Sequence, residues 1–148
     1  MALGEYVITY DIGTTGSKTC LYACGSQMIL VDSVLREYPL HILSGGGAEQ
    51  DPEEWWRAIC ASTREILQRN PLASQQISGL SFCCQMQGLV VVDKNGKLLR
   101  RAMSYMDQRA VEQKRKGISS GICFSGYNAA RALSSLRITG GLAASVKD

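Results

Sequence analysis

The feature that most constrains this chain is an octapeptide near its amino terminus, residues 11–18, which reads Asp-Ile-Gly-Thr-Thr-Gly-Ser-Lys. It follows a run rich in β-branched and aromatic residues at 6–10 and precedes a second such run, so two strands are predicted. Gly13 and Gly16 let the backbone between them turn tightly and approach a ligand closely, because neither carries a Cβ. The chain is therefore expected to begin with a hairpin that places a carboxylate, Asp11, at the tip of its first strand.

This hairpin has two interpretations. In the functional one, clustered backbone N–H groups form a concave anion site suited to phosphate, and Thr14 and Thr15 add two hydroxyls. Asp11 would hold Mg²⁺ directly or through water, and Lys18 would add a point charge beside the phosphates. In the structural one, the same Asp, Gly and Thr residues are ordinary turn formers. Spacing alone leaves both open, and it does not match the Walker A loop, which leads into a helix.

Composition excludes several classes of protein. The chain has 148 residues, of which 45% are hydrophobic, enough for one domain with its own core. The net charge of +3 comes without a clustered basic face, so no nucleic-acid partner is expected. No apolar run reaches the length of a membrane span, and the first residues do not resemble a secretory signal. We therefore expect neither membrane insertion nor secretion.

The six cysteines have apolar flanks, so we interpret them as small buried side chains in a reducing compartment, the cytoplasm. The chain contains no CxxC pair, and His41 is its single histidine. Both observations argue against a zinc site, and the second argues against nucleophilic catalysis that depends on histidine.

The first third of the chain is predicted to be an antiparallel meander. Its strands are expected at 6–11, 18–24 and 29–38, because short turns link three β-rich runs. Glycines at 45–47 make residues 43–48 a flexible loop by composition.

A helix is predicted next. Asp51 is a good N-cap, Pro52 fits the first helical position, and Glu54 has the spacing of a capping box. The helix is expected to end at Asn70, before a proline. Its tryptophan pair, 55–56, is interpreted as a core anchor in preference to a ligand-stacking pair.

The remaining elements follow from the same signals. A strand at 77–83, parallel to the first, leads into an exit loop at 85–88. A hairpin is predicted from strands at 89–93 and 98–105, joined by the Asn-Gly turn at 95–96. Beyond it we expect helices at 110–116 and 128–136, with a loop at 117–126 between them.

The order of strands and helix is that of a ribonuclease-H-like α/β fold, a mixed sheet with flanking helices. Ligands of such open sheets gather at the carboxyl ends of the strands. Asp11, the 85–88 loop and the 105–109 loop are therefore expected to reach one cleft.

Residues 11–18 resemble the first phosphate motif of the superfamily that contains sugar kinases, actin and the Hsp70 ATPases. Three further segments resemble the FGGY carbohydrate kinases, and xylulokinases in particular. Residues 49–56 resemble the helix start of xylulokinases, and 105–109 are similar to a segment with Trp, Asp and Arg. Residues 85–88 resemble the sugar-contacting loop, which is Met-His-Gly in xylulokinases and Arg-Glu in glycerol kinase. The resemblance covers nearly the whole chain.

This resemblance implies transfer of the γ-phosphate of MgATP to a hydroxyl of a ketopentose or related polyol, with ATP and Mg²⁺ as cofactors. Asp11 would serve Mg²⁺ or its water shell. The residues implied to hold phosphate oxygens are Gly13, Thr14, Thr15 and Lys18.

The resemblance also implies a sugar site. Met86 and Gln87 would meet the substrate, and Tyr105 would pack near it. Asp107 would accept hydrogen bonds from sugar hydroxyls or orient its own loop. Gln87 stands where relatives have His or Glu, and its neutral amide leaves the identity of the sugar open.

In the family, the proton-accepting Asp, the second phosphate loop and the adenosine site all lie beyond a segment of this length. Residues 1–148 are thus expected to be the amino-terminal part of the first domain, incomplete and without the second lobe. We expect no appreciable kinase activity from it alone. Its open sheet edge should expose apolar surface meant for the remaining lobe, which favours self-association, for example as a homodimer.

Two other functions stay open. A ribonuclease-H-like nuclease could recruit Glu49 or Asp107 beside Asp11 for a two-metal site. Against it, Glu49 precedes the helix and no basic face accompanies the acids. The second is a non-catalytic actin-like or chaperone-like nucleotide lobe, or a regulatory pseudokinase. The segments 50–56 and 85–88 favour the sugar branch.

Overall fold

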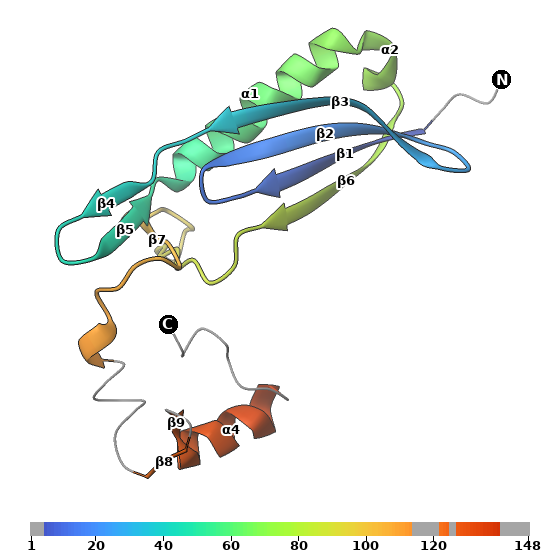
Figure 1. Ribbon diagram of the computed structural model, residues 1–148. Helices are drawn as coiled ribbons and strands as arrows, with labels where there is room; N and C mark the ends of the chain where they lie inside the picture. Colours follow the sequence, from blue (N-terminus) through green and yellow to red (C-terminus); the bar gives the residue numbers. More distant parts are fainter. Residues whose placement is uncertain (1–4, 114–121, 125–126, 140–148) are drawn as a thin grey trace.

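The computed structural model describes residues 5–113, 122–124 and 127–139, and its centre is a four-stranded sheet (Figure 1). The strands of this sheet are β1 (Glu5–Ile12), β2 (Gly16–Cys24), β3 (Met28–Glu37) and β6 (Ile77–Cys84), in the order β3-β2-β1-β6. β2 runs antiparallel to both β1 and β3, whereas β6 is parallel to β1. The predicted meander and the predicted parallel strand are both confirmed.

The crossover from β3 to β6 contains α1 (Pro52–Arg69), which covers one face of the sheet (Figure 1). The Asp51 carboxylate caps the helix by accepting the backbone N–H of Glu53, at 3.0 Å. The predicted capping box does not form, because Asp51 bonds Glu53 and not Glu54 through its side chain. The helix ends as predicted at Asn70, and the short α2 (Pro71–Ser74) follows.

The core lies between α1 and the sheet. Its buried apolar side chains come from β1, β2, β3, α1 and α2: Ile8, Tyr10, Leu21, Val34, Ile66 and Ala73. Two hydroxyl pairs join the layers, Thr19 with Ser62 at 2.6 Å and Tyr10 with Thr63 at 2.9 Å. The core role predicted for the tryptophan pair is wrong for Trp56, which is 63% exposed.

A second, smaller sheet replaces the loop predicted at 43–48. It consists of β4 (His41–Leu43), β5 (Gly47–Gln50) and β7 (Ala102–Met103), all antiparallel. The glycines that suggested flexibility instead make the tight β4–β5 turn, with φ of +77° at Gly45 and +83° at Gly46. Both values lie in the left-handed region, which residues with a Cβ rarely adopt and which glycine adopts readily.

The hairpin predicted from 89–93 and 98–105 is present, but most of its two arms are not regular strands. Leu99 N donates to Val91 O at 3.0 Å, and the backbones of Leu89 and Met103 exchange two hydrogen bonds at 2.9 Å. β7 is the regular part of the second arm, and it also pairs with β5. The first strand contributes only the isolated bridges Leu89–Met103 and Val92–Leu98. The Asn-Gly turn is present, with Gly96 at φ +80° donating to Asp93 O at 3.0 Å.

The carboxyl-terminal part contains β8 (Cys123–Phe124), β9 (Tyr127–Asn128) and α4 (Ala129–Thr139). α4 confirms the helix predicted at 128–136. Of the helix predicted at 110–116, residues 111–113 are helical and 114–116 lie outside the described residues; most of the loop predicted at 117–126 does too. Nowhere in the described ranges is a helix long and apolar enough to span a bilayer.

β6 forms an open edge of the sheet as far as the structure describes it. Phe82 lies beside Tyr10 in the β1–β6 register, and their rings stack with centroids 4.9 Å apart. Leu80 and Phe82 are nevertheless 58% and 60% exposed, as expected for an edge that lacks a cover. Cys83 and Cys84 are exposed too, so the buried position predicted for the cysteines fails here.

Candidate functional site

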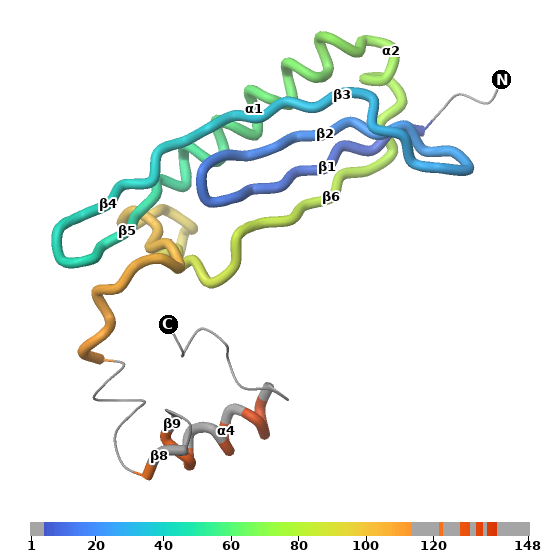
Figure 2. Tube along the Cα trace, in the orientation of Figure 1, coloured from blue at the N-terminus to red at the C-terminus, as the bar shows by residue number. Residues whose placement is uncertain are grey.

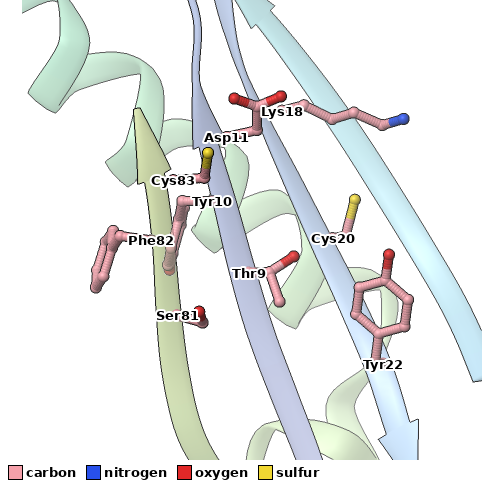
Figure 3. Close-up of a pocket in the computed structure, with 9 residues that line it drawn as sticks. All are labelled: Thr9, Tyr10, Asp11, Lys18, Cys20, Tyr22, Ser81, Phe82 and Cys83. Atoms are coloured by element: carbon pink, nitrogen blue, oxygen red, sulfur yellow. The ribbon is translucent and has the colours of Figure 1, made fainter. Parts of the chain in front are cut away.

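A pocket of about 260 Å³ opens on the face of the main sheet opposite α1 (Figure 3). Side chains alternate along a strand, and Ile8 and Tyr10 belong to the core, so Thr9 and Asp11 point the other way. The lining comes from β1, β2 and β6: Thr9, Tyr10, Asp11, Lys18, Cys20, Tyr22, Ser81, Phe82 and Cys83. The carboxylate predicted at the strand tip thus borders a cavity and not the core.

Asp11 and Lys18 are cross-strand partners in the β1–β2 register, and both are exposed. Within the described part of the chain, neither side chain makes a hydrogen bond or an ion pair with another residue. Figure 3 shows the Lys18 ammonium extending away from the Asp11 carboxylate. Both charges therefore remain available to a ligand.

The 13–16 turn has its carbonyls engaged by the protein. Gly13 N donates to Gly16 O at 2.9 Å, and Gly13 O accepts from the Tyr38 hydroxyl at 2.6 Å. Thr15 O accepts from Tyr38 N at 3.2 Å. Among the described residues, the N–H groups of Thr14 and Thr15 donate to no hydrogen-bond acceptor. The turn thus offers free donors beside a carboxylate and an ammonium, an arrangement that suits phosphate with a cation.

Tyr38, the residue directly after β3, holds this turn in place. Burial, together with the charge of Asp11, raises the pKa of the Tyr38 phenol to about 12. The phenol therefore stays protonated and keeps donating to Gly13 O at neutral pH.

The 85–88 loop leaves β6 at the same end of the sheet as the 13–16 turn (Figure 2). Gln85 N extends the parallel ladder by donating to Ile12 O at 2.8 Å. Met86 is 75% exposed, and Gln87 has φ +64°. Gln87 is the one non-glycine residue in the left-handed region among those the structure describes. Such strain is concentrated at functional loops.

In the 105–109 loop, Tyr105 is exposed whereas the Asp107 side chain is buried. The Asp107 carboxylate accepts from Ala48 N and Arg109 N, each at 3.0 Å, and from the Arg109 guanidinium at 2.6 Å. The hydrogen bond from Arg109 lowers the Asp107 pKa to about 2, with further help from the backbone donors. Both carboxylate oxygens are occupied, so the geometry fits orientation of the loop.

Glu49 on β5 anchors the same loop. Its Oε1 accepts from Arg109 at 2.7 Å and from Arg100 at 2.5 Å, and the bond from Arg109 is the main cause of its lowered pKa. Glu49 is thus committed to two arginines, which speaks against the metal-ligand role that a nuclease would require. Arg109 also packs closely against β5, because a Cβ on Gly47 would lie 3.1 Å from Arg109 Nε.

Gln50, also on β5, joins two of these segments and was missed by sequence reasoning. Its Nε2 donates to Thr14 O at 2.7 Å, and its Oε1 accepts from Gln85 Nε2 at 2.7 Å. Nothing in the local pattern marks a glutamine before an N-cap as a bridge, because both partners are distant in sequence.

The predicted site residues therefore fall into two groups. Asp11 and Lys18 line the pocket, and the 13–16 turn adjoins them. The four predicted sugar residues do not line this pocket: Met86, Gln87, Tyr105 and Asp107. Their loops and the turn all attach to β5, which lies at the same end of the sheet (Figure 2).

Solved structures that share this arrangement are sugar kinases. The ligand-bound xylulose kinase from Lactobacillus acidophilus matches with a TM-score of 0.68 and 28% identity, over 76% of this chain and 22% of that one. The gluconate kinase from the same organism matches with a TM-score of 0.69 and 27% identity over the same shares. The fold is the ribonuclease-H-like fold of the actin, Hsp70 and sugar kinase superfamily.

Residues 6–125 match the amino-terminal domain of the FGGY family of carbohydrate kinases. The chain belongs to this family. It is 35% identical to the xylulose kinase of Staphylococcus epidermidis over 105 residues, which are 71% of this chain and 21% of that protein. It is 31% identical to the gluconokinase of Bacillus subtilis over 106 residues, 72% of this chain and 20% of that protein. The chain thus spans about a fifth of the length of these relatives.

Proposed function

We propose that residues 1–148 form the amino-terminal part of the first domain of a kinase that transfers the γ-phosphate of MgATP to a hydroxyl of a ketopentose or related polyol. The observation that carries the proposal is the 13–16 turn, whose free N–H groups adjoin two unpaired charges, Asp11 and Lys18. Xylulose kinases, gluconokinases and glycerol kinases among the relatives support a polyhydroxylated acceptor.

The proposed roles toward ATP and Mg²⁺ follow from the chemical groups at the turn: a carboxylate, backbone N–H groups and an ammonium. Asp11 supplies the hard oxygen ligand that Mg²⁺ prefers, directly or through its water shell. Thr14 and Thr15 donate N–H groups to phosphate oxygens, Gly13 leaves room for their approach, and Lys18 adds a charge. When bound, Mg²⁺ would neutralise part of the phosphate charge.

The sugar roles fall to the two loops. Met86 and Gln87 project from the 85–88 loop toward the acceptor, with the Gln87 amide both donating and accepting hydrogen bonds. Tyr105 offers an exposed aromatic surface for the sugar. Asp107 orients the 105–109 loop, because Ala48 N and Arg109 already occupy its oxygens.

Calorimetry with the Mg²⁺ complex of AMP-PNP, a non-hydrolysable ATP analogue, tests the proposal on the 148-residue chain. Asp11→Asn should weaken binding by about tenfold, since it removes the charge that meets the cation. Glu5→Gln is the matched control, because Glu5 is exposed at the opposite end of β1 and lies on the same face as Asp11. Equal affinity of the wild type and Asp11→Asn would contradict the assignment.

A further inference from the structure

We propose that Gln50 is a positioning residue that couples the 13–16 turn to the 85–88 loop, so that phosphate binding at one alters the other. The inference rests on the proposed function for the identity of the two ligands. The bridge itself is a feature of the described contacts, and no motif of the chain pointed to it.

The two hydrogen bonds fix the orientation of the Gln50 amide. The Thr14 carbonyl can only accept, so Gln50 must present its NH₂ group there, at 2.7 Å. Its Oε1 then faces Gln85 Nε2, also at 2.7 Å. Gln50 is 1% exposed, and water therefore cannot easily replace either partner.

Neither partner has a substitute for Gln50 in the described part of the chain. Gln85 Oε1 is buried without a hydrogen bond, so Gln50 alone holds the Gln85 side chain. Thr14 O likewise accepts from Gln50 only. Leaving a buried polar group unpaired is costly, so a displacement of either segment carries the Gln50 side chain with it.

The bridge has rigid supports. Gln50 pairs with Ala102 of β7 and directly precedes Asp51, the N-cap of α1. On the far side, Gln85 directly precedes Met86 and the strained Gln87. A shift of Thr14 on phosphate binding is therefore passed through the Gln50 side chain to the residues proposed to meet the sugar.

Amide NMR spectra of the 148-residue chain, titrated with Mg²⁺ and inorganic triphosphate, test the coupling without any turnover. In the wild type, the amides of the 13–16 turn and those of 86–88 should both shift. Gln50→Met keeps the length of the side chain and removes both hydrogen bonds. The shifts at 86–88 should then be lost while those at the turn remain. Gln68→Met, on the exposed side of α1, is the control and should behave like the wild type.

Gln85→Met cuts the bridge from its other end and leaves the bond between Gln50 and Thr14 in place. It should give the same loss at 86–88, and it serves if Gln50→Met fails to fold. Persistent shifts at 86–88 in either folded variant would overturn the inference. Wild-type shifts confined to the turn would overturn it too, and would leave the proposed function standing. A wild-type turn that does not shift at all would refute the proposed function and this inference together.

Discussion

At the scale of single residues, Gly16 determines how the 13–16 turn meets the sheet. A Cβ at this position would lie 2.8 Å from Arg36 O on β3, a backbone atom that cannot rotate away. The absence of a side chain thus lets β2 and β3 approach closely beside the turn. Tyr38, which follows β3, can then reach Gly13 O.

Replacing Gly16 with alanine should therefore lower the free energy of unfolding by about 1–3 kcal/mol, the usual cost of overpacking. Urea denaturation measures it. Gly25→Ala is the control, because a Cβ there would only contact Gln27 O, at 3.9 Å. Equal stability of the two variants would show that β3 yields without cost.

Asp107 gives the site a defined response to acid. Its pKa is held at about 2, against an ordinary value of 3.8, chiefly by the hydrogen bond from Arg109. A carboxyl group whose pKa is lowered by folding stabilises the folded state at pH values above its ordinary pKa of 3.8. This stabilisation is lost as the pH falls through about 2. The variant Asp107→Asn lacks this titrating carboxyl group and therefore serves as the reference.

The difference in unfolding free energy between wild type and Asp107→Asn should consequently shrink as the pH is lowered from about 4 to about 2. Thermal or urea unfolding over that range measures the difference. A difference that stays constant down to pH 2 would mean that the ion pair with Arg109 does not hold the carboxylate.

At the scale of elements, the long ones could be predicted and the short ones could not. β1, β2, β3, α1 and β6 each carry a periodic pattern or a cap within their own residues. β5 and β7 have four and two residues, and they exist because they pair across about 50 positions. The same reason hid Gln50, whose partners lie 36 and 35 positions away. The 11–18 motif, by contrast, is contiguous in the sequence, so the phosphate site that it suggests could be predicted from local residues alone.

β6 exposes large apolar side chains at an edge of the main sheet. Leu80 and Phe82 are exposed at an edge where, in the described sheet, β1 is the single neighbour. We expect the chain to self-associate as its concentration rises, because an open apolar edge favours pairing. Leu80→Lys should lower the average mass in sedimentation experiments.

The control for Leu80→Lys is Leu72→Lys, which changes an even more exposed leucine on α2. It should associate like the wild type. A wild type that stays monomeric at every concentration, or an equal effect of both substitutions, would remove β6 from the explanation.

At the scale of the whole molecule, the chain matches about a fifth of the length of its curated relatives. Among the residues that the structure describes we assign no proton acceptor for the sugar hydroxyl, because Asp11 is proposed to serve the cation and the Asp107 and Glu49 carboxylates are committed to arginines. The chain alone should therefore bind a magnesium-bound triphosphate without phosphorylating xylulose, gluconate or glycerol. Coupled assay of ADP release measures this, and steady sugar-dependent turnover would contradict it.

The central claim is that Asp11 and the adjoining 13–16 turn hold a metal-bound triphosphate. Mn²⁺ in place of Mg²⁺, added with AMP-PNP, reports the position of the cation by broadening nearby amide signals. The account predicts the strongest broadening at residues 12–15, lost in Asp11→Asn and kept in Glu5→Gln. Broadening centred elsewhere, or unchanged in Asp11→Asn, would contradict it.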